Sequence, residues 1–318
     1  MKKSGSIWGV FAAWAAIYLL FAILKPATFL SVSNLELMMR QSILIGLGAI
    51  GMTYVIMSGG IDLSAGSAAA FSTVCGAIAL NVTGNPWVAL LACIAAGLFC
   101  GLINGISTAT LKAGPFIVTL GSMLAIRGLA KGLAGEKTVS TGGESWLFSL
   151  ASALNPSQKW LIISPGAWVW LAFLLLLSLA LQYTTFGRNV VAIGSNEQAA
   201  RLCGVKVEAV KIGVYTLAGF FFGLAGLMSL SRTTLGDPTS SVGDELKIIA
   251  AVVIGGASLN GGEGSLWGAA LGVLIMTTIG MGCTQMGIPN WVQEIMTGVI
   301  ILAAVALDRW RLSRAVTA

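Results

Sequence analysis

Two glycine-rich segments, 59–67 and 255–265, repeat one spacing of glycine and polar residues. Each begins with two glycines, then has a leucine three positions after the second glycine and a serine or asparagine next to it. Both interrupt apolar sequence. A break in a membrane helix is tolerated only where protein or a watery cavity receives the freed backbone groups, and paired breaks indicate a transport pathway. The residues marked by this pattern are Gly59, Gly60, Asp62, Ser64, Gly255, Gly256, Ser258 and Asn260.

The carboxylates of these two segments have a simpler explanation than transport. Asp62 precedes an apolar stretch that it can cap, and Glu263 lies near the start of another. A tight turn with a capping carboxylate accounts for both side chains, and we favour it for them. The matching spacing also suggests an internal duplication.

A polar segment at 184–209 has the pattern of a short helix between two apolar stretches. Ser195 or Asn196 can cap its start, Glu197 suits the positive end of its dipole, and Gly204 stands where a glycine ends a helix. Such an element is either an ordinary helix at the membrane interface or a docking site for a soluble partner. The residues alone leave both open.

Several kinds of catalytic site are excluded by residue type. The chain has no histidine, and its five cysteines form no Cys-x-x-Cys pair, so we expect no metal site and no catalytic residue. A membrane-embedded hydrolase is disfavoured because no serine or cysteine has a plausible base beside it. The stretch 128–138 approaches a phosphate-binding loop but has Glu136 where a glycine is required. We therefore expect this chain to bind no ATP or other cofactor.

The elements that position these residues are membrane helices. Of the 318 residues, 56% are apolar and 9% are charged, and the mean hydropathy is +0.89, which a water-soluble fold cannot accommodate. We predict an all-α integral membrane protein forming one domain over 1–318. A helix crosses a bilayer with about 20 apolar residues. The ten spans that we expect on this basis are 7–24, 42–58, 65–82, 87–111, 115–131, 161–182, 210–231, 246–260, 265–283 and 291–307.

The basic residues predict the orientation. They flank apolar segments at Lys2 and Lys3, around the 184–209 loop and at 309–314, as the positive-inside rule requires, so the net charge of +6 does not indicate nucleic-acid binding. We expect both termini and the loop 184–209 in the cytoplasm. The loop-like segment 132–160 then lies on the outer side.

Two further polar sites remain ambiguous. Arg127, near the outer end of the fifth expected span, could line a pathway or extend its charge to the interface, and we expect the second. The segments Asp237-Pro238 and Asp244-Glu245 could meet an external partner or belong to a solvated loop. No acidic residue is expected in the middle of a span.

Several stretches resemble the permeases of bacterial ATP-binding-cassette (ABC) sugar importers, in particular the ribose-type branch. They are Gly-Gly-Ile-Asp-Leu-Ser-Ala-Gly-Ser at 59–67, Phe-Ile-Val-Thr-Leu-Gly at 116–121, Arg-Gly at 127–128, Gly-Arg-Asn at 187–189, the run 192–200 and the run 245–259. The resemblance covers about 35–307. It departs from the family pattern at Ser195, where the family more often has glycine or asparagine. It also departs at Ala65, where the family more often has valine.

The resemblance implies a function and partners. The chain is expected to be the transmembrane subunit of an importer in the bacterial inner membrane that moves a small sugar by alternating access. The implied partners are a second permease copy or a paralogue, a cytoplasmic ATPase that uses the ATP, and a periplasmic sugar-binding protein. The segment 187–204 is implied to be the coupling element in a cleft of the ATPase. Its expected contact residues are Gly187, Arg188, Asn196, Glu197, Ala199, Ala200 and Gly204.

An ion-coupled secondary transporter is the alternative. It would need a membrane carboxylate to carry protons. Asp62 is the carboxylate placed near a break in the interior of the chain.

Overall fold

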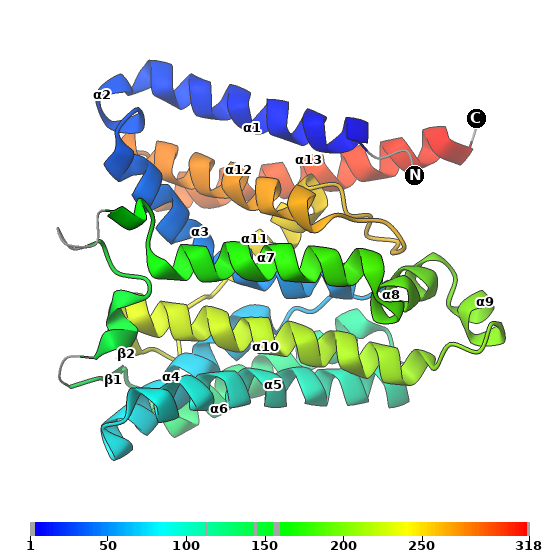
Figure 1. Cartoon of the computed structure of the whole chain (residues 1–318), viewed down its shortest axis with the longest axis horizontal. Coiled ribbons are helices and arrows are strands. Elements are labelled where there is room, and N and C mark those ends of the chain that lie inside the picture. The colour runs from blue at the N-terminus through cyan, green and yellow to red at the C-terminus, as the bar shows by residue number, and fades with distance from the viewer. Residues whose placement is uncertain (1–3, 112, 143–144, 155–159, 317–318) are drawn as a thin grey trace.

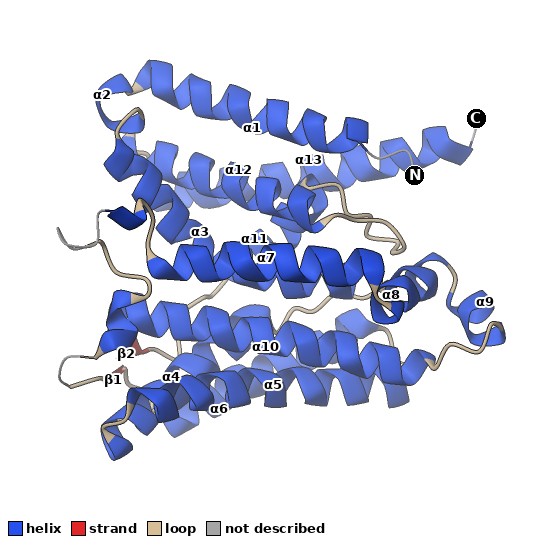
Figure 2. Ribbon diagram, in the orientation of Figure 1, coloured by secondary structure: helices blue, strands red, loops and turns tan. Residues whose placement is uncertain are grey.

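The computed structural model describes residues 4–111, 113–142, 145–154 and 160–316, which form a bundle of long helices lying roughly side by side (Figure 1). The basic residues Lys2, Lys3 and Lys112, used above for the orientation, lie outside the described residues, as do parts of the expected outer loop at 143–144 and 155–159. Nearly all of the described chain is helical (Figure 2).

The helices begin and end at the following residues. They are α1 (Ser4–Leu24), α2 (Pro26–Phe29), α3 (Val32–Met57), α4 (Ala65–Thr83), α5 (Pro86–Thr110), α6 (Pro115–Leu133), α7 (Pro165–Tyr183), α8 (Thr185–Ser195), α9 (Glu197–Leu202), α10 (Val207–Thr233), α11 (Asp244–Ile254), α12 (Leu266–Gln285) and α13 (Asn290–Val316). A 3-10 helix, η1 (Trp146–Ser149), and two short antiparallel strands, β1 (Val139–Ser140) and β2 (Leu235–Gly236), complete the described elements.

Eight of these helices are long and apolar enough to cross a membrane: α1, α3, α4, α5, α6, α7, α10 and α12. The prediction of an all-α integral membrane protein is thereby confirmed. The expected count of ten full spans is corrected among the described residues. The span expected at 246–260 is α11, which has 11 residues and ends at the second glycine-rich segment. The span expected at 291–307 lies within α13, which has 27 residues.

The bundle has two distinct ends (Figure 1). The strands and η1 lie at one, called here the sheet end, and α8 and α9 lie at the other, called the α9 end. The segments 132–160 and 184–209 are thus at opposite ends, as the predicted orientation requires. The free ends of α1 and α13 both lie toward the α9 end.

The centre of the bundle is built on glycines that let two helices touch. Gly97 and Gly101 of α5 lie against Gly219 and Gly223 of α10, so closely that an added side-chain carbon at any of them would overlap the backbone of the other helix. Small residues four positions apart bring membrane helices into this kind of contact, where close packing replaces the hydrophobic effect. The high glycine content of the sequence is explained in part by this crossing.

Helix α1 lies outside this core and packs along α12. The indole nitrogen of Trp14 donates a 3.3 Å hydrogen bond to Thr278, and the ring of Phe21 lies against Gly282. Phe21 also contributes to a small core with Phe29 and Cys283 that is separate from the main one. The apolar stretch of α1 is only 17% buried.

Candidate functional site

Helices α8 and α9 form an elbow that projects from the α9 end (Figure 1). Helix α8 is capped by Thr184, whose hydroxyl accepts a 3.1 Å hydrogen bond from the Gly187 amide. Helix α9 is capped by Asn196, whose side-chain oxygen accepts a 2.9 Å hydrogen bond from the Ala199 amide. Of the two caps open from the sequence, Asn196 is therefore the one used. Gly204 follows α9 with φ +84°, the left-handed conformation in which glycine ends a helix.

A set of ion pairs fixes α9 against the start of α10. Lys211 approaches Glu197 at 2.7 Å, and Arg201 approaches Glu208 at 2.7 Å and Glu197 at 3.7 Å. Each exposed pair contributes at most about 1 kcal/mol. Together they connect a helix of six residues, too short to be stable alone, to a span of the bundle.

The residues expected to contact an ATPase divide by exposure. Arg188, Asn196, Glu197, Ala199 and Gly204 are exposed on the elbow. Gly187 and Ala200 are buried.

Gly187 and Ala200 belong to the packing of the elbow itself. Gly187 is buried where α8 passes the end of α7, with the Leu181 carbonyl occupying the place of a side chain. Ala200 is 5% exposed and is part of the main core. The expectation that Ala200 lets a partner approach closely is therefore corrected, because its methyl group points inward.

The two glycine-rich segments meet each other and the end of α8. The Gly262 amide donates a 2.9 Å hydrogen bond to the Met57 carbonyl, which ends α3. Gly194 of α8 lies against both of these groups, and a side-chain carbon at Gly261 would come within 2.9 Å of the Gly59 Cα. Gly59, Gly261 and Gly262 have φ between +74° and +86°, which favours glycine. We call this contact of Met57, Gly59, Gly194, Gly261 and Gly262 the glycine joint.

Asp62 lies behind the first break in a fully buried polar cluster. Its Oδ1 accepts hydrogen bonds from the amide of Ser64 at 2.8 Å and from the hydroxyl of Ser64 at 2.7 Å. The Asn104 amide donates to the Ser64 hydroxyl at 2.7 Å and to Asp62 Oδ2 at 3.3 Å. These bonds hold the turn that leads into α4. The N-cap residue of α4 is Ser64, without a side-chain capping bond, so Asp62 orders the preceding turn and does not cap the helix as expected.

The second break is a loop closed by its own hydrogen bonds. The Ser258 amide donates to the Glu263 carbonyl, the Gly261 amide donates to the Ser258 carbonyl, and both bonds are 3.0 Å long. Gly255, at the end of α11, lies directly against the backbone of Gly268 in α12. The break therefore joins two helices that are packed without side chains between them.

Most of the residues expected along a transport pathway have little exposure. Asp62 and Ser64 are fully buried, and Gly60, Gly255 and Ser258 are also classed as buried. Gly256 is intermediate, whereas Gly59 and Asn260 are exposed at the α9 end. In this conformation most residues of the two breaks are buried by packing.

A re-entrant segment at 237–243 is the feature that sequence reasoning missed. It connects β2 to α11, and Arg127 of α6 fixes it by donating from Nη1 to the carbonyls of Pro238 at 2.9 Å and Ser240 at 2.6 Å. The expectation that Arg127 extends to the interface is therefore wrong. Asp244 and Glu245 form the first turn of α11, so of the two possibilities left open for them the solvated loop does not apply. The short length of the eighth apolar stretch, 246–260, was the signal in the sequence that could have indicated this segment.

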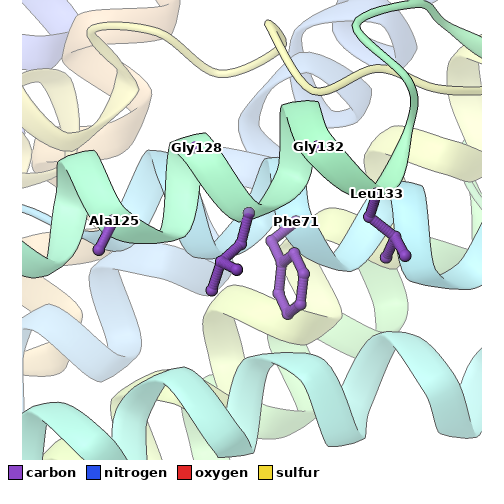
Figure 3. Close-up of a pocket in the computed structure, with 6 residues that line it drawn as sticks. Phe71, Ala125, Gly128, Gly132 and Leu133 are labelled. Carbon is purple, nitrogen blue, oxygen red and sulfur yellow. The ribbon is translucent and has the colours of Figure 1, made fainter.

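A groove of about 700 Å³ lies between α4 and α6 (Figure 3). It is lined by Phe71, Ala125, Gly128, Leu129, Gly132 and Leu133. Its lining is apolar, which suits another helix or lipid better than a polar ligand. Among the described residues no group of three or more histidine, cysteine or acidic side chains could hold a metal ion.

Comparison with known proteins places the chain in a family. A family model described as the permease component of a branched-chain amino acid transport system matches residues 34–305. The L-arabinose transport system permease protein AraH of Escherichia coli is 38% identical over 312 residues, covering 96% of this chain and 92% of that protein. The ribose import permease protein RbsC of Bacillus subtilis is 38% identical over 311 residues, covering 97% and 93%. RbsC of Escherichia coli is 35% identical over 307 residues, covering 92% and 91%.

These matches extend over almost the whole bundle, including the elbow, both breaks and the re-entrant segment. They confirm the expectation of a transport subunit rather than an enzyme. The chain belongs to the family of permease components of the branched-chain amino acid transport type.

Proposed function

We propose that this permease is the membrane-spanning subunit of an ATP-driven importer for a monosaccharide. The observation that carries the proposal is the connection of the projecting elbow to both helix breaks through the glycine joint. An external ATPase that moves α8 would thereby act directly on the ends of α3 and α11. Such an arrangement suits a subunit that performs no covalent chemistry and is driven from outside.

The substrate class follows from the relatives. The relatives described above are named for L-arabinose and ribose, two five-carbon sugars, although the family description names amino acids. We propose a monosaccharide as the cargo, with these two pentoses as the first candidates. A periplasmic binding protein delivers it at the sheet end.

The orientation in the bacterial inner membrane follows from charge. Arg188, Arg201, Lys206 and Lys211 surround the elbow, so we place the α9 end and both termini in the cytoplasm. The sheet end then faces the periplasm. A second permease, identical or paralogous, completes the membrane part, and ATP is used by the partner ATPase.

The ATPase docks on the exposed side of the elbow. We assign this contact to Arg188, Asn196, Glu197 and Ala199, with Gly204 ending the helix that carries them. Gly187 and Ala200 support the elbow from inside. The break residues transmit the movement of the elbow. Gly59 does so within the glycine joint, and Gly255 and Gly256 do so at the end of α11. The other break residues hold the turns behind them: Gly60, Asp62, Ser64, Ser258 and Asn260.

Asp62 is not needed as a proton carrier in this proposal. Its carboxylate is engaged by Ser64 and Asn104 in the turn that starts α4. The ion-coupled alternative therefore has no separate observation in its favour.

The test is uptake by purified subunits in proteoliposomes. The permease is reconstituted with and without its partner ATPase. The internal ATP and the external binding protein loaded with labelled L-arabinose or ribose are varied. We expect uptake to require both partners and ATP hydrolysis. Uptake by the permease alone, driven by a proton or sodium gradient, would contradict the proposal.

A further inference from the structure

Helix α11 is a half-span whose first turn lies inside the bundle. Its 11 residues extend about 16 Å, roughly half of a bilayer core of about 30 Å. Its last turn is packed at the α9 end, where Gly255 contacts Gly268. Asp244 and Glu245 in its first turn are therefore near the middle of the membrane.

Irregular backbone leads to this first turn from the sheet end. The segment 237–243 runs from β2 into the bundle, and the Thr73 hydroxyl and Asp237 amide are 3.2 Å apart at its start. Arg127 holds two of its carbonyls. Its far end is tight against α4, since a side-chain carbon at Gly66 would collide with the Ser241 carbonyl and with Glu245. One side of this segment is thus fixed against α4 and α6.

The other side of the segment is open. Val242 is 69% exposed, Leu246 is 49% exposed, and the side chain of Lys247 is 43% exposed although it pairs with Asp244 at 3.0 Å. One oxygen of Glu245 is buried with no hydrogen-bond partner in the described part of the chain. Charged groups and non-helical backbone therefore border an open face at mid-membrane depth.

Lipid cannot cover such a face. Charged side chains are costly in hydrocarbon, and they occur at this depth where protein or a water-filled cavity receives them. The half-exposed Lys247 and its partner Asp244 therefore suit a passage better than contact with acyl chains.

We infer that the face formed by Val242, Leu246 and Lys247 borders the water-filled path of the sugar. This inference rests on the proposed function. The ammonium group of Lys247 can donate hydrogen bonds to sugar hydroxyls. A single chain leaves this face open, so the second permease copy forms the opposite wall.

Thiol labelling tests the inference with a matched pair of positions. Leu246 is 49% exposed on this face, and Leu175 is 51% exposed at the middle of α7 among other exposed leucines. Each is changed to cysteine in a cysteine-free background of the complete transporter. Membranes are then treated with a sulfonate-bearing methanethiosulfonate, which does not enter hydrocarbon.

We expect Leu246→Cys to react on the order of tenfold faster or more than Leu175→Cys, because a charged reagent is excluded from lipid. Val242→Cys should behave like Leu246→Cys, and added L-arabinose or ribose with binding protein should change the rate at both. Equal rates at Leu246→Cys and Leu175→Cys, whether both fast or both slow, would overturn the inference. ATP-dependent uptake by the cysteine-free parent is a separate readout, and its failure with every sugar would count against the proposed function instead.

Discussion

The Gly262 amide and the Met57 carbonyl are joined by a 2.9 Å hydrogen bond, although they belong to helix breaks in opposite parts of the sequence. Gly194 at the end of α8 lies against both groups. Main-chain atoms of the elbow therefore contact both the end of α3 and the loop that follows α11.

Gly194→Ala should uncouple the elbow from the breaks. The new methyl group would overlap the Met57 carbonyl and the Gly262 amide, and backbone cannot rotate away as a side chain can. Overpacking of this kind costs about 1 to 3 kcal/mol. We expect sugar uptake to fall by on the order of tenfold or more, while the ATPase still co-purifies because the exposed side of α9 is unchanged.

Gly280→Ala is the control for this substitution. Gly280 lies in α12 with nothing within 4 Å of an added carbon, and alanine favours a helix by about 1 kcal/mol. Uptake should be unchanged. Full uptake by Gly194→Ala would show that the joint carries no movement.

Ala199→Glu and Ala200→Glu should both prevent ATPase binding, for different reasons. Ala199 is exposed, so a glutamate there obstructs docking without disturbing the permease. Ala200 is 5% exposed, so a glutamate there places a charge in the core of the elbow and destabilises the permease itself. Pull-down of the ATPase and thermal unfolding of the purified permease separate the two effects.

The expected outcome is loss of binding in both variants and a lowered melting temperature only in Ala200→Glu. Gln198→Ala, exposed on the same helix, serves as the matched control. Normal ATPase binding by Ala199→Glu would identify the elbow as an interfacial helix.

Arg127→Lys should loosen the re-entrant segment. Both bonds come from Nη1, which lies one bond farther from the Cα than the ammonium nitrogen of a lysine, so a lysine at this position does not reach both carbonyls. A hydrogen bond to a charged group contributes about 1.5 to 3 kcal/mol, and each kcal/mol lost lowers the melting temperature by roughly 2 to 4 °C. We expect lower thermal stability and faster proteolysis within 237–243. Lys131→Gln, on the exposed side of α6, should change neither property.

Asp62→Asn should retain most of the uptake. An asparagine oxygen can still accept the bonds from Ser64, and the Asn104 side-chain oxygen, which has no partner among the described residues, can accept from the new amide after a flip. Asp62→Leu should instead reduce the level of folded permease, since it removes the acceptor of the buried Ser64 amide and hydroxyl. Loss of uptake by Asp62→Asn at normal protein levels would favour a proton-carrying role.

The long helices and the start of α9 could be predicted from sequence because their signals are local. Apolar length locates α3 or α10, and the Asn196 and Gly204 caps need few neighbours. The inward direction of Ala200 could not be predicted, because a helix of six residues has too little periodicity to define a face.

The longer-range contacts of the site lay beyond sequence reasoning. The glycine pattern marked both breaks, but nothing in it indicated Gly194 as the third member of the joint, since that contact is made by backbone. The bonds of Arg127 to Pro238 and Ser240 connect residues more than a hundred positions apart. A short apolar stretch after Glu245 was therefore interpreted as a full span.

The packing of α1 on α12 has a consequence for biosynthesis. Trp14 and its partner Thr278 are 264 positions apart, so at about 5 to 20 residues per second the first helix waits on the order of 10 to 50 s for its neighbour to be made. Its apolar stretch is only 17% buried, so α1 can reside alone in lipid during that time. The bundle is thus closed on this side by one of the last helices to leave the ribosome, and a nascent chain stalled before α12 would hold α1 unattached.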